Sequence, residues 1–215
     1  MSMKNLFFSF TLIILSSISL IAQTTGDYRS NAATFNWNAT ASWQRWNGSA
    51  WISNPAEGYP GQNASGIAGT VTIQNGHTVT GNVDVTTNDI GNLVFQGSGI
   101  LSMNNNNDID ATGNLTMDAT SQIQGNGSSR VLRVTGNFIV PATATNVRIA
   151  GITLTINGTT TVTGTLTLTN NNGTKTFRGA VTVSGSWTST AITTTGRLVF
   201  GGEVMTSGTF DCGCN

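Results

Sequence analysis

Residues 112–140 read TGNLTMDATSQIQGNGSSRVLRVTGNFIV, and the two ends of this stretch are nearly the same phrase. Gly113 begins GNLTM and Gly136 begins GNFIV, so the phrase returns after an interval of 136 − 113 = 23. Forms of it begin along the chain at Gly69, Gly91, Gly113, Gly136, Gly158, Gly179 and, loosely, Gly201. Their successive spacings are 22, 22, 23, 22, 21 and 22. A near-constant interval of this size indicates a repeat architecture.

Each repeat has room for three short strands. In the phrase itself, apolar residues alternate with other residues, which places Leu115 and Met117 on one face of a strand. Further alternating segments are typified by Leu166-Thr167-Leu168 and Leu154-Thr155-Ile156, and Gly, Asn and Ser separate the segments. We therefore predict an all-β, right-handed parallel β-helix with coils of about 22 residues that stack at ~4.8 Å.

If the coils stack in this way, two contacts between neighbouring coils are expected. Leu115 and Phe138 should point into the core one above the other, and the asparagines that follow the glycines should form a hydrogen-bonded ladder. Gly158 departs from the pattern because Thr160 stands where the other repeats have an apolar residue. The alternative is an antiparallel sandwich, with a hairpin at 74–77, but a sandwich does not predict a constant return of one phrase.

Residues 1–22 predict a secretory signal peptide. Lys4 supplies a positive start, the uncharged run 6–20 follows, and Ala22-Gln23 is a plausible cleavage point. This run is shorter than the ~20 residues that span a membrane, so no membrane span is expected in the mature chain. Without Lys4 the mature chain has 9 − 1 = 8 basic and 9 acidic residues, a net charge of about −1. Nucleic acid is therefore not an expected partner.

The region 23–61 is rich in tryptophan and is predicted to cap the β-helix of 62–215. Asn47-Gly48 suggests a two-residue type I′ hairpin turn, which would set Trp46 diagonal to Trp51 and Trp43 opposite Ile52. A cap is expected because the first coil of a solenoid otherwise exposes unpaired strand edges. The alternative is a platform for sugar rings formed by Trp46 and Trp51.

The head also carries a resemblance to known families. The order GDYRS, NWN, ASWQRWNGSAW, YPG and VTIQNGHTV, within residues 26–103, resembles the amino-terminal region of surface and secreted proteins exported by type IX secretion in gliding-type bacteria. It is also similar to the eight-glycine extracellular domain, which leads into a parallel β-helix. The resemblance implies an extracellular or cell-surface, often adhesive role and no single reaction. A carboxy-terminal sorting domain is not seen, so the β-helix is expected to continue beyond residue 215.

Few residues suggest reaction chemistry. Asp89, Asp108 and Asp110 fall at neighbouring-coil positions, with Arg130 and Arg133 about one coil later. We interpret this group as a surface salt-bridge patch, with a weak Ca²⁺ site and catalysis as alternatives. His77 is expected to be an exposed turn residue without a partner. The role of Cys212 and Cys214 is left open, because one intervening residue would strain a disulfide between them.

These observations favour a secreted or cell-surface structural or adhesive module without catalytic residues, cofactor or metal. The alternative is a β-helix that binds or cleaves extracellular polysaccharide. Ice binding would need outward Thr-x-Thr pairs on every coil, but only Thr70/Thr72 and Thr159/Thr161 fit among six coils.

Overall fold

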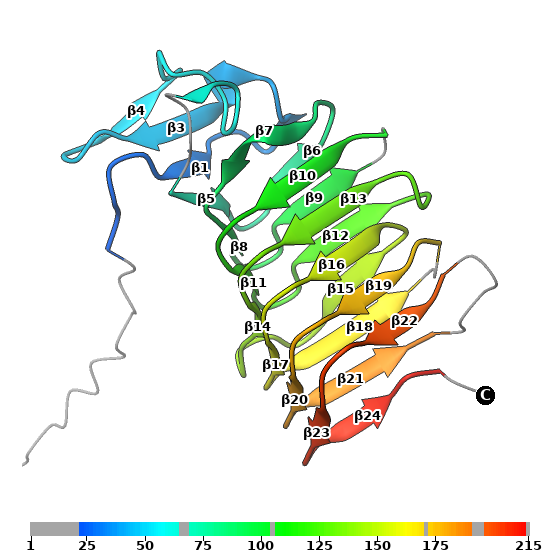
Figure 1. Cartoon of the computed structure of the whole chain (residues 1–215). Coiled ribbons are helices and arrows are strands. Elements are labelled where there is room, and N and C mark those ends of the chain that lie inside the picture. The colour runs from blue at the N-terminus through cyan, green and yellow to red at the C-terminus, as the bar shows by residue number, and fades with distance from the viewer. Residues whose placement is uncertain (1–21, 65–68, 104–105, 170–171, 191–195, 214–215) are drawn as a thin grey trace, which may run out of the picture.

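A computed structural model of the chain describes residues 22–64, 69–103, 106–169, 172–190 and 196–213. The predicted signal peptide, apart from Ala22, lies outside the described residues. The described strands form three sheets that run along a rod, with the head at one end and the last coil at the other (Figure 1). Among the described residues, no helix is long and apolar enough to cross a membrane.

The first sheet contains, in chain order, β1 (Tyr28–Ser30), β3 (Trp43–Trp46), β4 (Trp51–Ser53), β5 (Thr70–Ile73), β8 (Asn92–Phe95), β11 (Leu115–Met117), β14 (Phe138–Val140), β17 (Thr160–Val162), β20 (Val181–Val183) and β23 (Val204–Thr206). The second contains β2 (Thr34–Asn36), β6 (Thr78–Thr80), β9 (Ile100–Met103), β12 (Gln122–Gly125), β15 (Val147–Ala150), β18 (Thr165–Thr169), β21 (Ser186–Ser189) and β24 (Thr209–Asp211). The third contains β7 (Val85–Ile90), β10 (Asp108–Ala111), β13 (Val131–Val134), β16 (Thr153–Ile156), β19 (Lys175–Phe177) and β22 (Leu198–Phe200). A 3₁₀ turn, η1 (Thr40–Ser42), precedes β3.

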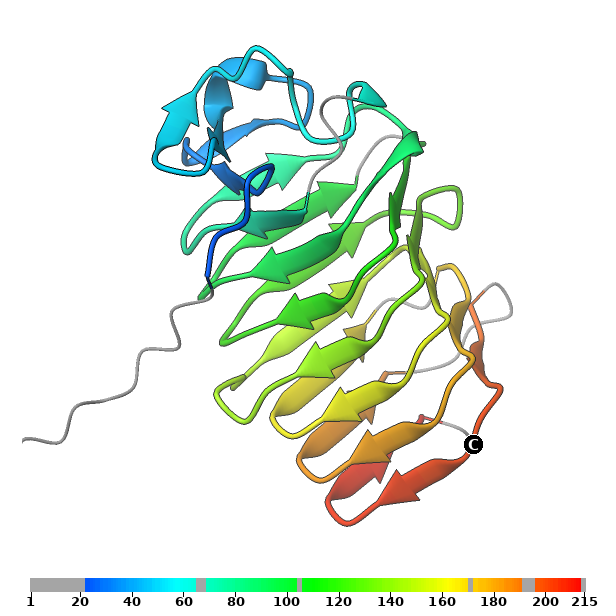
Figure 2. The ribbon, with the colours of Figure 1, turned by 60° about the vertical axis from the view of Figure 1, so that its left-hand side comes forward.

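The predicted parallel β-solenoid is confirmed. Each coil contributes one strand to each sheet, and each strand pairs in parallel with its counterparts in the coils before and after (Figure 2). Leu115 pairs with Phe138, as the repeat phrase predicts, and both side chains are fully buried. The core therefore consists of the inward residues of three sheets, which alternate with outward residues along every strand.

The recurring glycine is explained by how closely successive coils approach. The Gly136 N–H donates to the Gly113 carbonyl at 3.0 Å. A Cβ atom on Gly136 would lie 2.4 Å from that same carbonyl oxygen, so no side chain fits at this corner. In the last repeat the stacked glycine is Gly202 rather than the predicted Gly201, because Val204 pairs with Val181 and a Cβ on Gly202 would meet the Gly179 backbone.

The asparagine ladder is also confirmed, and its bonds run from backbone to side chain. The Asn114 N–H donates to Oδ1 of Asn92 at 2.8 Å, and the Asn137 N–H donates to Oδ1 of Asn114 at the same distance. The Thr159 N–H extends the series by donating to Oδ1 of Asn137 at 2.9 Å. Each asparagine therefore joins its own corner to the corner of the next coil.

Two polar side chains occupy inward positions of the core. Thr160 lies between Phe138 and Val181, and its hydroxyl has no hydrogen-bond partner within the described part of the chain. Lys175 lies between Leu154 and Leu198, almost completely buried, and its Nζ donates to the Gly173 carbonyl at 2.8 Å. Both positions therefore depart from the apolar pattern at a cost in burial energy.

Coil stacking already begins within the tryptophan-rich head. β1 pairs in parallel with β5, and β2 pairs in parallel with β6. β3 and β4 then extend the first sheet in antiparallel fashion beyond β1. The side chain of Trp43, the first residue of β3, lies on the inner face of this hairpin. The centre of its ring is 5.1 Å from that of Phe35 and 5.2 Å from that of Trp37, and all three rings are buried.

The hairpin register differs from the sequence prediction. Trp46 lies directly opposite Trp51, and Ile52 faces Arg45 instead of Trp43. The loop has four residues, because Oδ1 of Asn47 accepts the N–H groups of Ser49 and Ala50 and so holds a wider turn. Of Asn47 and Gly48, only Gly48 has a positive φ, whereas a type I′ turn needs both. The shift is two residues, so Trp46 and Trp51 remain on the same face of the hairpin.

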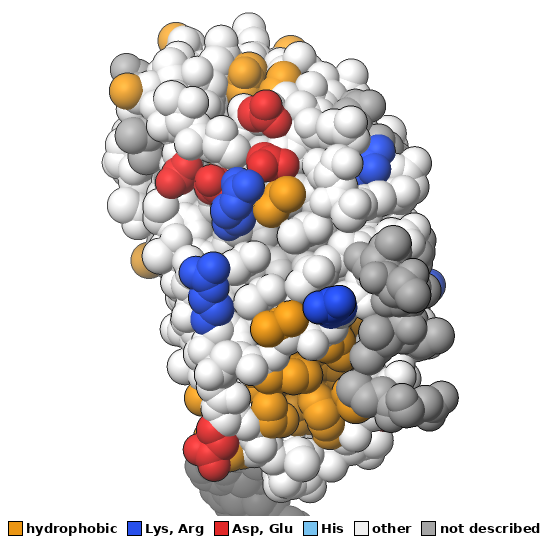
Figure 3. Space-filling model, turned by 45° about the vertical axis from the view of Figure 1, so that its right-hand side comes forward, with side chains coloured by type: hydrophobic (Ala, Val, Ile, Leu, Met, Phe, Trp, Pro, Cys, Tyr) orange, Lys and Arg blue, Asp and Glu red, His pale blue; other side chains and the backbone are white. Residues whose placement is uncertain are grey.

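The last described coil is less covered than the others. Leu198, Phe200, Val204 and Phe210 are only partly buried, and Val199 is exposed. Apolar side chains accordingly gather near this end of the rod in Figure 3. Cys212 follows β24 and takes part in a disulfide bond, and Cys214 lies outside the described residues. Continuation of the β-helix past residue 215 stays a prediction.

Candidate functional site

A small open pocket lies where the head meets the first two complete coils. Its volume is about 170 Å³. The residues that line it are Gln23, Asp27, Arg29, Trp51, Thr70, Thr72, Gln74 and Gln96. They come from the segment before β1, from β1, β4 and β5, and from the segments that follow β5 and β8. The pocket therefore forms only when the hairpin and two coils stack.

Strand alternation explains why polar residues line this pocket. On β5, Val71 and Ile73 point into the core, which turns Thr70 and Thr72 outward. Gln74 and Gln96 each follow the last core residue of their strand, and these core residues pair with each other, so the two glutamines are adjacent at the outer surface. Arg29 is the outward residue of β1 and lies in register beside Thr72.

Asp27 is held in place by the backbone of the first coil. Its Oδ1 accepts the Thr70 N–H, and its Oδ2 accepts the Thr24 N–H, both at 2.7 Å. The bond to Thr70 repeats the corner bond of the asparagine ladder, two coils before the Asn92–Asn114 bond. Asp27 is buried, so its main role is to anchor the start of the solenoid at the base of the pocket.

Arg29 carries the positive charge of the pocket. Its guanidinium carbon lies 4.3 Å from the centre of the Trp51 ring, a cation–π distance, and its Nε donates to Oε1 of Gln44 at 2.7 Å. Partial burial lowers the pKa of Arg29, although an arginine remains charged at physiological pH. Within the described ranges, no carboxylate forms an ion pair with Arg29.

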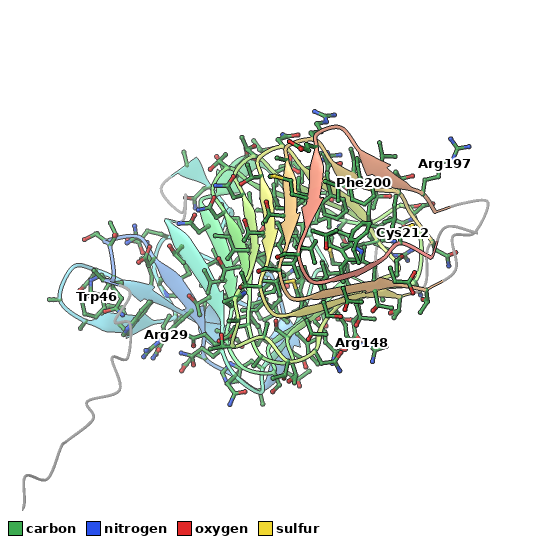
Figure 4. All side chains as sticks on the ribbon, turned by 90° about the horizontal axis from the view of Figure 1, so that it is seen from below. Arg29, Trp46, Arg148, Arg197, Phe200 and Cys212 are labelled. Atoms are coloured by element: carbon green, nitrogen blue, oxygen red, sulfur yellow. The ribbon has the colours of Figure 1, made fainter. Side chains whose placement is uncertain are left out.

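The two residues predicted to form a sugar platform are neighbours. The ring centres of Trp46 and Trp51 are 5.5 Å apart, and their planes are inclined by 60°. Two planes at this angle do not form one flat surface, so a single sugar ring can stack on only one of them at a time. Only Trp51 lines the pocket. Figure 4 shows Arg29 and Trp46 at the same end of the molecule, far from Phe200 and Cys212.

The predicted salt-bridge patch on the third sheet is confirmed for Asp108, Asp110 and Arg133. Nη2 of Arg133 lies 2.9 Å from Oδ2 of Asp108, and Nη1 lies 2.9 Å from Oδ1 of Asp110. Figure 3 shows acidic and basic side chains side by side on this face, toward the head. Burial, and then the charge of Asp110, raise the pKa of Asp89. Over the described ranges, no three His, Cys, Asp or Glu side chains are grouped so that they could hold a metal ion.

The sequence prediction for His77 was wrong, because this residue is half-buried and has a partner. Its Nδ1 lies 2.8 Å from Oγ of Ser30, and that hydroxyl also accepts the Gln74 N–H at 2.9 Å. Burial lowers the pKa of His77. The pair resembles a nucleophile and its base, but Ser30 is completely buried, so no substrate reaches its oxygen. The contact instead fixes β1 to the turn of the next coil.

The sequence patterns did not predict this pocket. The repeat register could have indicated its glutamines, since Gln74 and Gln96 follow equivalent phrases in successive repeats. Arg29 and Trp51 gave no such signal, because their positions depend on how the hairpin docks. Comparison with known proteins found no matching family model, no matching curated protein and no matching solved structure.

Proposed function

We propose that this chain is a secreted or cell-surface structural and adhesive module, in which the solenoid is a rigid support and the head contacts extracellular polysaccharide. The observation that carries the proposal is the pocket beside Trp51, which combines an aromatic ring with amide, hydroxyl and guanidinium groups. Sugars present hydroxyl groups that these side chains can hydrogen-bond, and C–H faces that pack on an aromatic ring.

The solenoid suits the role of a support. Its coils are joined in all three sheets, and the glycine corners and asparagine ladder add bonds between successive coils. A rod of this kind holds one end at a fixed distance and orientation from the other, since each coil contacts only its neighbours in a regular stack. A binding site at one end is thus presented away from the rest of the rod.

A non-catalytic role is supported by how the reactive groups are used. Arg133 bonds both Asp108 and Asp110, so these carboxylates are engaged in ion pairs. The serine of the Ser30–His77 pair is enclosed in the first coil. Polysaccharide cleavage is kept as the second candidate on one observation: burial, and then the charge of Asp110, raise the pKa of Asp89, and a carboxyl group with a raised pKa is a feature of glycosidases.

Binding can be tested by retention of the mature chain on an array of extracellular polysaccharides. We expect Trp51→Ala to lose retention, because it removes the pocket's aromatic wall. Ile52→Ala is the matched control, since Ile52 is the next residue on β4, is exposed and lies outside the pocket. Equal melting temperatures would show that both variants are folded. A wild-type chain retained by none of the polysaccharides would overturn the proposal.

Cleavage can be tested separately with pectin, alginate and other uronate polymers in the presence of Ca²⁺. We expect neither new unsaturated ends nor new reducing ends. Activity that disappeared in both Asp89→Ala and Asp110→Ala would establish the second candidate instead. Arg148→Ala serves as a control for this assay, because Arg148 points outward from a different sheet.

A further inference from the structure

Arg29 gives the pocket a positive charge, which an aromatic wall alone would not supply. It is a guanidinium in a small pocket whose other lining groups are amides, hydroxyls, an indole and one carboxylate. That carboxylate, Asp27, already accepts a backbone N–H on each oxygen. We infer that the pocket binds a sugar unit that bears a carboxylate, such as a uronate. This inference rests on the proposed polysaccharide-binding function.

Contacts on two sides orient the guanidinium before any ligand binds. The Trp51 ring lies against its face, and Gln44 accepts from its Nε. Arginine pairs with a carboxylate through two parallel N–H···O bonds, and an arginine fixed in this way loses less conformational entropy on binding. The Nη groups are the donors that these two contacts leave for a ligand, since the only side-chain hydrogen bond from Arg29 in the described part of the chain uses Nε.

The size and lining of the pocket match a single sugar unit. Its volume of about 170 Å³ is below the ~300–1,000 Å³ of pockets that enclose drug-sized ligands. Gln74, Gln96 and Thr72 offer donors and acceptors at the rim for sugar hydroxyl groups. The Thr70 Oγ1 accepts from Nδ2 of Asn92 at 3.2 Å, which leaves its own O–H free to donate. One acidic unit within a longer chain, or at its end, fits this arrangement.

A matched pair of ligands isolates the carboxylate. Oligogalacturonate and its methyl ester share the same rings, but only the acid carries the charge. Titration calorimetry with the mature chain should show that the acid binds at least about 10-fold more tightly than the ester, which corresponds to ~1.4 kcal/mol, because only the acid can form charge-assisted hydrogen bonds with Arg29. Added salt should reduce the difference in affinity between the acid and the ester.

Variants of Arg29 test whether this residue causes the preference for the acid over the ester. Arg29→Gln should bind acid and ester equally, and Arg29→Lys should retain part of the preference, because a lysine keeps the charge without the planar fork. Arg148→Gln removes an exposed charge from the second sheet and should leave the preference unchanged (Figure 4). Melting temperatures close to wild type would confirm that the variants fold.

The possible outcomes separate the two proposals. Wild-type protein that binds acid and ester equally would overturn the carboxylate preference and leave polysaccharide binding intact. A preference for the acid that persists in the Arg29→Gln variant would also overturn this inference, since a residue other than Arg29 would then bind the carboxylate. If neither these oligosaccharides nor any polysaccharide on the array bound, the proposed function itself would fail.

Discussion

Leu115 and Phe138 occupy equivalent positions in neighbouring coils, paired strand to strand, and neither side chain reaches solvent. Leu93 continues the same row in the coil before. Because each coil covers the inward residues of the last, a polar group in this row is shielded from water on both sides. Stability should therefore depend strongly on which face of the strand a substitution affects.

Leu115→Asp should lower the free energy of unfolding by about 4 kcal/mol or more, because it buries an unpaired carboxylate. Thr116→Asp is the matched control: Thr116 is the next residue on β11 and points outward. It should cost about 1 kcal/mol or less. Urea unfolding of both variants measures the difference. Equal losses for the two variants would contradict the assigned faces.

Gly136→Ala should destabilise the fold by about 1–3 kcal/mol, the usual cost of overpacking, because the new Cβ would meet the Gly113 carbonyl. Gly81→Ala is the control. A Cβ at Gly81 would find its nearest neighbours at 3.8 Å, and the φ of Gly81 is not positive. That variant should be neutral or gain ~0.4–1 kcal/mol from the stiffer unfolded chain. A stable Gly136→Ala protein would show that the corners are not closely stacked.

Thr160→Val should raise the free energy of unfolding by about 1 kcal/mol. The substitution keeps the shape of the side chain and removes a buried hydroxyl that has no partner within the described residues. Thr161→Val, one position along β17 and outward, should change stability by less than ~0.5 kcal/mol. A loss of stability in Thr160→Val would imply that the hydroxyl is hydrogen-bonded to water in solution.

Stability should rise with pH above about 8 because of Lys175. Burial lowers the pKa of this lysine from 10.5 to about 8. Between these values the unfolded chain binds more protons than the folded chain, so the free energy of unfolding increases with pH, in total by about 3 kcal/mol. Below pH 8 Lys175 is charged in both the folded and the unfolded chain, so the free-energy cost of burying its charge is constant. Burial raises the pKa of Tyr28 to about 12, which reduces stability again above pH 10.

Urea unfolding of the wild type at several pH values between 7 and 9.5 measures this slope. Lys175→Met should remove the rise and should be more stable than the wild type at pH 7, since no charge is buried there. A wild-type stability that stayed flat over this interval would mean that Lys175 reaches solvent when it is charged.

Trp43→Ala should cost about 3–5 kcal/mol, as for other buried tryptophans. Trp43 is completely buried, packs on Phe35 and Trp37, and donates from Nε1 to the Trp37 carbonyl at 2.7 Å. Trp46→Ala, in the same strand but only half-buried, should cost far less. It should also reduce polysaccharide retention less than Trp51→Ala does, because Trp46 lies outside the pocket. A larger effect of Trp46 on retention would favour the sugar platform.

Much of the solenoid could be predicted from local patterns. The return of glycine and alternating apolar residues identifies the first-sheet strands, and the same alternation at Leu166–Leu168 and Leu154–Ile156 identifies β18 and β16 in the other two sheets. This works because each coil makes the same contacts as the last, so one repeat length implies the whole stack. Where the pattern weakens, at Gly201 and Gly202, the predicted register was one residue off.

The sequence by itself determined the architecture, because strand alternation and close glycine corners are local requirements that recur in every coil. Only the tertiary structure decided the head and its pocket. The wider turn at Asn47 depends on a side-chain acceptor, and the contact of Arg29 with Trp51 depends on how the hairpin docks on β1. Such contacts join segments that share no period, so no repeat in the chain encodes them, and the packing of the head fixes their positions.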